Sequence, residues 1–253
     1  MTEEFPGPRT AIVTGGARRI GAALVRALAA DGWHLLIHCH RSADEAERLA
    51  GEIGNAAIVR AELGDPDCAE RIFDGLAGLP PPRLLVNNAS QFRDDSLADF
   101  SPDQWDRHQA VNLRAPALLT QAFAAALGAE SNGANGLIVN LLDAKLATPN
   151  PDFFSYTIAK MGLAGLTELS ARALAPQVRV CGIAPSVTMV SGPQSHENFD
   201  KVHRLNALRR GVEADQIVAA LRFIIASPTL TGQTITLDAG LRFLSLPRDV
   251  QYL

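Results

Sequence analysis

Short apolar runs alternate along the chain with stretches whose apolar residues recur every three or four positions. Runs of four to eight apolar residues are typical of buried strands, and a repeat near 3.6 residues is typical of helices packed on a sheet. Strands that alternate with helices predict an α/β fold, a single-domain doubly wound parallel sheet with helices on both faces. We expect strands at 10–13, 33–39, 56–59, 84–86, 137–142, 178–183 and 234–237, and helices at 22–30, 43–53, after Pro66, from Ser101 to near Gly128, and at 155–174.

The segment 186–211 interrupts this alternation. It is polar, contains Gly192-Pro193 and predicts only a short helix at 199–208. Insertions of this kind between regular elements are often lids over a ligand, so we expect 186–211 to be a substrate lid within the domain. Residues 131–136, rich in Ser, Asn and Gly, predict a flexible connector.

The amino-acid composition limits the kinds of molecule that the protein is expected to bind. The 253 residues are 47% hydrophobic and 20% charged, which supports one large core, and the net charge of −4 argues against a general nucleic-acid or anionic-membrane binder. No stretch approaches the roughly 18 uncharged apolar residues of a spanning helix, and the N-terminus has no signal-like pattern. We therefore expect a cytoplasmic protein with a small-molecule partner. The cysteines are isolated from one another and predict buried thiols: Cys39, Cys68 and Cys181.

Tyr156 and Lys160 are the first candidates for chemistry. In a helix they stand one turn apart on the same face, so an ammonium lies close to a phenol. A free tyrosine with a pKa of about 10 exchanges protons poorly near pH 7, and a fixed cation that stabilises the phenolate lowers that pKa. The pair predicts a usable acid, which suits a reductase.

A glycine-containing turn, TGGARRIG at 14–21, follows the first strand. Its glycines permit a tight turn and the close approach of a pyrophosphate to the N-terminus of the next helix. An arginine occupies the place of the central glycine of many such loops, so an ordinary strand-to-helix connection stays an alternative; that arginine could also reach a cofactor phosphate. The expected cofactor contacts of the turn are Thr14, Gly15, Arg19, Ile20 and Gly21.

The end of the second strand indicates which cofactor is bound. A site that selects NAD places an acid there to bind the ribose hydroxyls, whereas a cation and a hydroxyl suit the extra phosphate of NADP. This chain has His40, Arg41 and Ser42 at that place and no acid. A solvated surface charge is the second interpretation, and a metal site built on His38-Cys39-His40 is third because further clustered ligands are lacking.

Together these residues resemble the short-chain dehydrogenase/reductase superfamily over residues 10–240. The resemblance implies a Rossmann fold and a nicotinamide cofactor. Its signposts occur in order along the chain: the turn at 14–21, Asn87-Asn88-Ala89-Ser90, Asn112, Tyr156, Lys160, Pro185, Thr231-Gly232 and Asp238-Ala239-Gly240.

The resemblance also implies roles for single residues. Tyr156 would be the acid, Lys160 would bind the nicotinamide ribose and lower the tyrosine pKa, and Asn112 would support a water-linked proton relay. Two departures affect contacts: Glu62-Leu63 stands where an aspartate usually meets the adenine, and Ser186 replaces a glycine. The implied cofactor contacts further along the chain are Glu62, Leu63, Asn88, Ala89, Ser90, Pro185 and Thr188.

A finer resemblance, to the pteridine reductases and the bacterial dihydromonapterin reductases, rests on Arg19, His40-Arg41-Ser42, Phe92 and Asp143. Most relatives carry serine in place of Asp143, and an ionised carboxylate cannot donate a hydrogen bond to a substrate carbonyl as serine does. It suits another proton route, in which Asp143 acts as a catalytic residue beside Tyr156. There it could accept, hold and return a proton, helping to protonate a ring nitrogen while NADPH delivers hydride to the adjacent carbon. A pterin could lie between the Phe92 ring and the nicotinamide. Alternatively, Phe92 is a core or lid aromatic and Asp143 caps the next loop.

The interpretation is therefore an NADPH-dependent reductase of a dihydropteridine such as dihydromonapterin, dihydrobiopterin or dihydrofolate. A carbonyl or 3-oxoacyl reductase of the same superfamily and a non-catalytic dinucleotide sensor are the alternatives. The family resemblance implies a homotetramer, and the apolar tail at 242–253 could be covered by a neighbouring subunit. The expected substrate contacts are Arg19, Ser90, Phe92, Asp143 and Tyr156.

Overall fold

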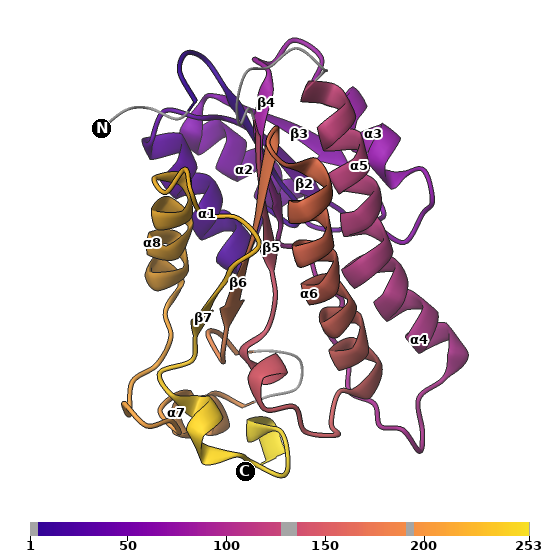
Figure 1. The fold of residues 1–253 in the computed structure, drawn as a ribbon, viewed down its shortest axis with the longest axis vertical. Helices are drawn as coiled ribbons and strands as arrows, with labels where there is room; N and C mark the ends of the chain where they lie inside the picture. Colours follow the sequence, from indigo (N-terminus) through magenta and orange to yellow (C-terminus); the bar gives the residue numbers. More distant parts are fainter. Residues whose placement is uncertain (1–4, 128–135, 191–194, 253) are drawn as a thin grey trace.

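A computed structural model describes residues 5–127, 136–190 and 195–252, and its centre is one sheet of seven parallel strands in the order β3-β2-β1-β4-β5-β6-β7. The fold predicted from the sequence is confirmed (Figure 1). Residues 131–135 of the predicted connector and 191–194 of the predicted lid lie outside the described residues. The strands are β1 Thr10–Val13, β2 His34–Cys39, β3 Ala56–Arg60, β4 Pro82–Asn87, β5 Gly136–Leu141, β6 Val178–Pro185 and β7 Thr234–Leu237.

Helices cover both faces of the sheet (Figure 1). The first core cluster joins the apolar stripes of α1, α2 and α8 to one face, and the second joins those of α3, α5 and α6 to the other. Both faces of the inner strands are thus buried, which explains their continuous apolar runs. The helices are α1 Arg19–Ala30, α2 Ala43–Ile53, α3 Cys68–Asp74, α4 Pro102–Gln109, α5 Ala115–Leu127, α6 Phe154–Leu174, α7 His196–His203 and α8 Ala214–Ile225.

Two helices differ from the sequence-based expectations. Helix α7 begins earlier than the expected 199–208, because the Ser195 hydroxyl caps it by accepting from the Asn198 backbone N–H at 3.1 Å. Helix α8 was not predicted, although its sequence carries the signals for one. Glu213 and Gln216 form a capping box, and Ile217, Leu221 and Ile224 repeat at helical spacing.

The long helix predicted from Ser101 is interrupted. Ser101 caps α4 as expected, but the π-turn Ala110–Arg114 joins α4 to α5. Such one-turn bulges are frequent at functional sites because they reorient side chains within a helix. Here the turn carries the buried Asn112 toward the site.

The strand order changes direction between β1 and β4, which are hydrogen-bonded neighbours. In open α/β sheets ligands bind beyond the carboxyl ends of the strands at this point. All seven strands run parallel, so these ends lie at one edge of the sheet, near α7 and the C-terminal segment at the lower end of Figure 1. The three cysteines are buried free thiols, as predicted. Nowhere in the described part of the chain is a helix both long enough and apolar enough to cross a bilayer.

A buried histidine on β2 supports the first turn. The backbone N–H of Gly15 donates to His38 Nδ1 at 3.1 Å, and His38 Nε2 lies 3.1 Å from the Ala61 carbonyl. Since an amide N–H can only donate, Nδ1 is the acceptor and Nε2 carries the proton. Burial lowers the pKa of His38 to about 4, so the ring stays neutral.

We expect His38 to make folding stability depend on pH. Below the ordinary histidine pKa of 6.5 the unfolded chain binds a proton that the folded chain excludes until about pH 4. As the pH is lowered from 6.5 to 4, the free energy of unfolding should therefore decrease by roughly 3 kcal/mol because of this group. Below pH 4 the contribution of His38 should no longer change. Urea unfolding of wild type and His38→Gln across this range measures the effect. An equal slope in the variant would contradict it.

Candidate active site

A cavity of about 630 Å³ lies at the carboxyl ends of the central strands. Its walls come from the glycine turn after β1, the loop after β4, the segment after β5, helix α6 and the loop after β6. Most of the predicted site residues face this space. They are Gly15, Arg19, Ile20, Gly21, Ser42, Asn88, Ala89, Ser90, Phe92, Asp143, Tyr156, Lys160, Pro185 and Thr188.

Tyr156 and Asp143 form the polar centre of the cavity. The Tyr156 hydroxyl donates to Asp143 Oδ2 at 2.7 Å, and the backbone N–H of Lys145 donates to Asp143 Oδ1 at 2.8 Å. Asp143 therefore also caps the short helix that follows, so the capping alternative describes one of its two oxygens. Burial raises the pKa of the Asp143 carboxyl, which favours its protonated form.

The pKa of Tyr156 is raised in this structure, and the expected lowering of that pKa by Lys160 stays a prediction. Burial raises the pKa of Tyr156 well above its usual value, and the neighbouring Asp143 raises it further. The Lys160 ammonium lies 5.7 Å from the centre of the tyrosine ring and donates to the Leu141 carbonyl at 2.6 Å. Burial lowers the pKa of Lys160 to about 8. The tyrosine is thus a protonated phenol whose acidity depends on Asp143.

Phe92 stands over this pair in a small aromatic cluster. Its ring stacks on Phe153 with centres 4.3 Å apart and meets the edge of Tyr156 at 4.7 Å. Asn112 clamps the residue before it: the Gln91 backbone N–H donates to Asn112 Oδ1 at 2.8 Å, and Asn112 Nδ2 donates to the Gln91 carbonyl at 2.8 Å. The side chain of Asn112 thus fixes the loop, and its predicted part in a proton relay stays a prediction.

The glycine turn packs too tightly to accept side chains. A Cβ on Gly21 would lie 2.2 Å from the Gly15 carbonyl oxygen, and Gly15 has a φ of +60°. Thr14 Oγ1 accepts from the backbone N–H groups of Asn88 at 2.9 Å and Ala89 at 3.0 Å, which joins the turn to the loop after β4. Gly15 and Gly21 line the cavity, so a ligand there can lie against the backbone of the turn.

Arg19 occupies the place of a glycine in many such turns, and its backbone has the left-handed conformation that glycine adopts easily. Its φ is +54°, in the left-handed region that side chains rarely adopt. The guanidinium donates to the Val190 carbonyl at 2.7 Å and thereby ties the turn to the loop after β6. Its contact with a phosphate stays a prediction.

A second hollow of about 370 Å³ adjoins the glycine turn and is strongly basic. His40 and Ser42 line it as expected, next to Arg41. Glu62 accepts from Arg107 at 3.0 Å and lies 3.3 Å from His40, while Leu63 packs into the core. Among the described residues no three His, Cys, Asp or Glu side chains group as a metal site. The guanidinium groups of the hollow belong to Arg18, Arg41, Arg93 and Arg107.

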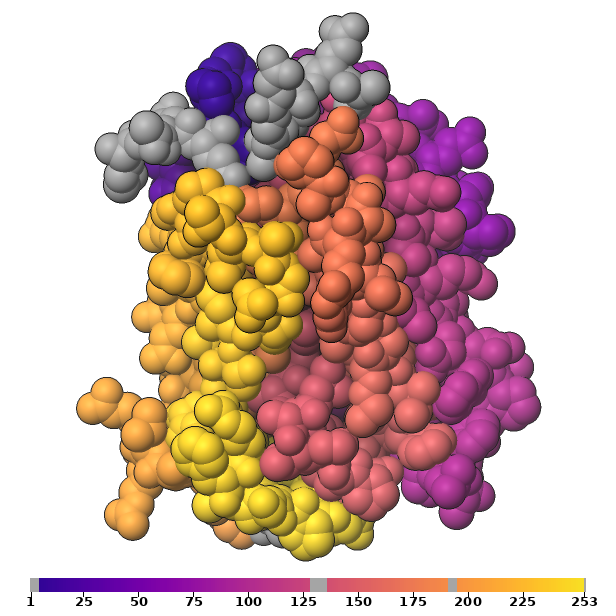
Figure 2. Space-filling view, viewed as in Figure 1, coloured from indigo at the N-terminus to yellow at the C-terminus, as the bar shows by residue number. Residues whose placement is uncertain are grey.

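The C-terminal segment contributes to the wall of the cavity, which the sequence did not predict. Asp249 and Gln251 line the cavity, and Asp249 Oδ2 lies 3.3 Å from the Lys145 ammonium. Arg248 donates to both carboxylate oxygens of Asp152 at 2.9 and 2.8 Å. Figure 2 shows this segment, in yellow, packed against the pink segment that follows β5. The tail thus packs partly on its own chain, while Phe243 is 69% exposed.

The sequence and the fold are similar to those of known reductases. A family model described as short chain dehydrogenase matches residues 9–200. The chain belongs to the short chain dehydrogenase family. The crystal structure of FolM alternative dihydrofolate reductase 1 from Brucella suis, in complex with NADP, is 38% identical; the match covers 96% of this chain and 97% of that one, with a TM-score of 0.88.

Two curated relatives represent the two predicted reductase classes. Pteridine reductase 1 of Leishmania tarentolae is 29% identical over 283 residues, covering 93% of this chain and 96% of its own length. The 3-oxoacyl-acyl-carrier-protein reductase of Synechocystis is 28% identical over 242 residues, covering 92% and 96%. The predictions of an oxidoreductase of this superfamily and of the pteridine reductase group are confirmed, and the predicted cofactor agrees with the NADP of the FolM structure.

Arg41 should decide the preference between the two nicotinamide cofactors. A charge-assisted hydrogen bond is worth roughly 1.5–3 kcal/mol, so Arg41→Ala should raise the KM for NADPH about tenfold or more and leave that for NADH unchanged. Initial rates with each cofactor measure this. Arg26→Ala is the matched control, because Arg26 pairs with Glu52 at 2.8 Å outside the hollow. Equal changes for both cofactors would count against the phosphate site.

Proposed function

We propose that this protein is an NADPH-dependent reductase of a dihydropteridine, with dihydromonapterin, dihydrobiopterin and dihydrofolate as candidate substrates. The observation that carries the proposal is the partly buried hydrogen bond between Tyr156 and Asp143 beside the ring of Phe92. The likeness to an alternative dihydrofolate reductase and to a pteridine reductase supports the same substrate class.

The residues of the site fit NADPH. The glycine turn leaves no space for side chains at Gly15 and Gly21, so its backbone can lie against a pyrophosphate. The basic hollow beside it has the donors that a ribose phosphate needs, and we propose Arg41 and Ser42 as its main contacts. Lys160, buried beside the cavity, would hold the nicotinamide ribose. Bound NADPH would supply the hydride.

The remaining space suits a flat heterocycle. Phe92 offers an aromatic face, and face-to-face packing of planar rings adds to the burial of their area. Ser90, Arg19 and the Asp249 carboxylate supply polar groups along the cavity walls. An aminopyrimidine edge carries both donors and acceptors, so it can pair with such a mixed set.

Asp143 controls when Tyr156 can act as an acid. An ionised Asp143 accepts a hydrogen bond from the phenol, which keeps the phenol O–H directed away from the substrate. A protonated Asp143 can instead donate to the tyrosine oxygen, so that oxygen releases its own proton to a substrate ring nitrogen as it receives the proton of Asp143. One hydride on the ring carbon and one proton on the nitrogen complete the reduction of the C=N bond. Burial raises the pKa of Asp143 and so favours the protonated form that this route needs.

A carbonyl or 3-oxoacyl reductase fits the same fold, but the single O–H of a protonated Asp143 would then have to replace the serine donor to the substrate oxygen as well as supply the tyrosine. A sensor that only binds the cofactor has no chemical need for the tyrosine–carboxyl pair. The lid at 186–211, the homotetramer and the cytoplasmic location stay predictions.

The test is oxidation of NADPH and NADH by the purified protein with a dihydropterin, dihydrofolate and a panel of ketones. We expect turnover of a dihydropterin with NADPH preferred. Tyr156→Phe should lower that turnover by at least about a hundredfold while NADPH binding is unchanged, because the variant lacks only the transferred proton. Turnover of ketones alone would favour the carbonyl reductase, and no turnover would favour the sensor.

A further inference from the structure

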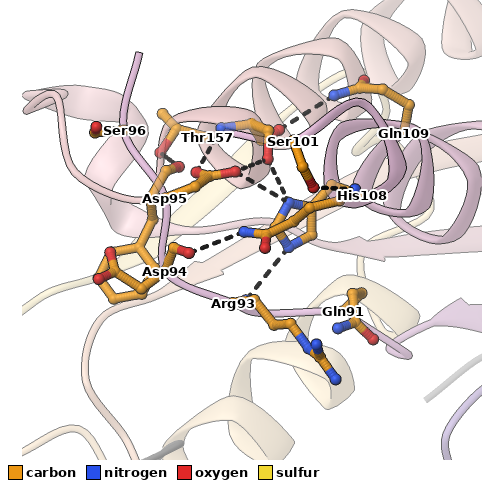
Figure 3. Close-up of polar contacts among 12 residues, drawn as sticks. Gln91, Arg93, Asp94, Asp95, Ser96, Ser101, His108, Gln109 and Thr157 are labelled. Atoms are coloured by element: carbon orange, nitrogen blue, oxygen red, sulfur yellow. Dashed lines mark hydrogen bonds and ion pairs between the residues drawn. The ribbon is translucent and has the colours of Figure 1, made fainter. Parts of the chain in front are cut away.

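A buried polar cluster lies close to Phe92 and Tyr156 in the sequence and in the fold, and Figure 3 shows its contacts around His108 and Asp95. It consists of His108 at the end of α4, Ser155 at the start of α6, and Asp95 in the loop after β4. Their exposed fractions are 0%, 0% and 6%. Three buried polar side chains need mutual hydrogen bonds to offset the loss of water, so their arrangement is tightly constrained.

The hydrogen-bond roles in the cluster follow from one backbone group. The Arg93 N–H points at His108 Nε2 at 3.3 Å, and since an amide N–H only donates, Nε2 is an acceptor. The proton of the neutral ring then lies on Nδ1, which donates to Ser155 Oγ at 2.5 Å. The Ser155 hydroxyl in turn donates to Asp95 Oδ2. Burial lowers the pKa of His108, which favours this neutral form.

This arrangement does not make a nucleophile. In a catalytic triad the histidine stands between the serine and the acid and takes the serine proton. Here the serine stands between the histidine and Asp95, and both ring nitrogens of His108 are occupied. The cluster is therefore a scaffold.

His108 of this cluster and the neighbouring Asn112 hold the two residues that flank Phe92 in the chain. Asn112 fixes Gln91 through two hydrogen bonds of 2.8 Å, and His108 accepts from the backbone of Arg93. The aromatic ring is thus carried by the one residue between two anchored neighbours. The two anchors lie four residues apart in the α4 and π-turn stretch, and both are buried.

The same imidazole also fixes the residue before the catalytic tyrosine. The Ser155 hydroxyl oxygen accepts a hydrogen bond from His108 Nδ1, and the Ser155 backbone N–H donates to Asp95 Oδ1 at 3.0 Å. Gln109 Nε2 donates to the Ser155 carbonyl at 3.1 Å. The His108 imidazole therefore connects Arg93, the residue after Phe92, to Ser155, the residue before Tyr156. The rings of Phe92 and Tyr156 are in contact, with centres 4.7 Å apart.

We propose that His108 is a positioning residue that sets Phe92 against Tyr156 and so shapes the substrate site. The inference rests on the proposed function, because it assigns to Phe92 the binding of a flat substrate ring. The two nitrogens of His108 have separate tasks: Nε2 holds the Phe92 loop, and Nδ1 holds the start of the tyrosine helix.

Two amide variants separate these tasks. His108→Asn keeps a donor near the Nδ1 position but lacks the acceptor for Arg93, so we expect the dihydropterin KM to rise about tenfold with kcat within about twofold. His108→Gln reaches the Nε2 position and loses the Ser155 contact, so we expect kcat to fall and KM to change little. His34→Gln, on β2 outside the site, is the control for the substitution itself. Identical effects of both variants on one parameter would overturn the proposal.

A double-mutant cycle shows whether His108 acts through Phe92. In a Phe92→Leu background His108→Asn should add less than about twofold to KM, because the ring that it positions is already gone. Effects that multiply independently would contradict the proposed coupling.

Hydrogen exchange of the Arg93 amide keeps the proposal testable without a substrate. Protection should be lost in His108→Asn and kept in His108→Gln, since only the second retains an acceptor. If wild type reduces no pterin, the proposed function fails, and this exchange alone decides the role of His108. Unchanged protection in His108→Asn would overturn it.

Discussion

The hydrogen bond from the Tyr156 hydroxyl to the Asp143 carboxyl is the contact on which the proposed chemistry of this site depends. Tyr156 is buried and Asp143 is partly buried, so each protonation state must be stabilised largely by the few neighbours that the fold provides. Burial raises the pKa of both groups, and the ionised carboxyl raises that of the phenol further. The direction of one hydrogen bond therefore determines whether the tyrosine keeps or releases its proton.

The rest of the site holds this pair and the space above it. Asp143 follows β5 and accepts from the backbone of Lys145, while Tyr156 stands in the first turn of α6. The loop after β4 brings Phe92 over both, held through Asn112 and His108. Parallel strands that end at one edge of the sheet bring these separate segments together. The proposed catalytic pair, Tyr156 and Asp143, thus meets an aromatic side chain from a different segment of the chain.

The sequence predicted the strands, because buried parallel strands are continuous apolar runs, and it predicted the residues of the cavity through ordered motifs. It did not predict groups whose roles depend on distant contacts. His38 supports Gly15 from the neighbouring strand, and Asp249 reaches the cavity beside Lys145. Helical spacing correctly put Lys160 beside the Tyr156 ring, yet its ammonium is committed to the Leu141 carbonyl and the tyrosine pKa rises. Local spacing could not reveal the burial of Tyr156, whereas the finer family resemblance had already placed Asp143, thirteen residues away, beside the tyrosine.

The most direct test of this account is the rate of a single turnover of a dihydropterin, measured against pH for wild type and Asp143→Asn. The account predicts that the wild-type rate falls as pH rises through the raised pKa of Asp143, because the ionised carboxyl retains the tyrosine proton. Asp143→Asn should be slower by about tenfold or more and show no such fall, since its amide does not titrate. A flat wild-type profile, or an unchanged profile and rate in the variant, would contradict the claim that Asp143 controls the proton of Tyr156.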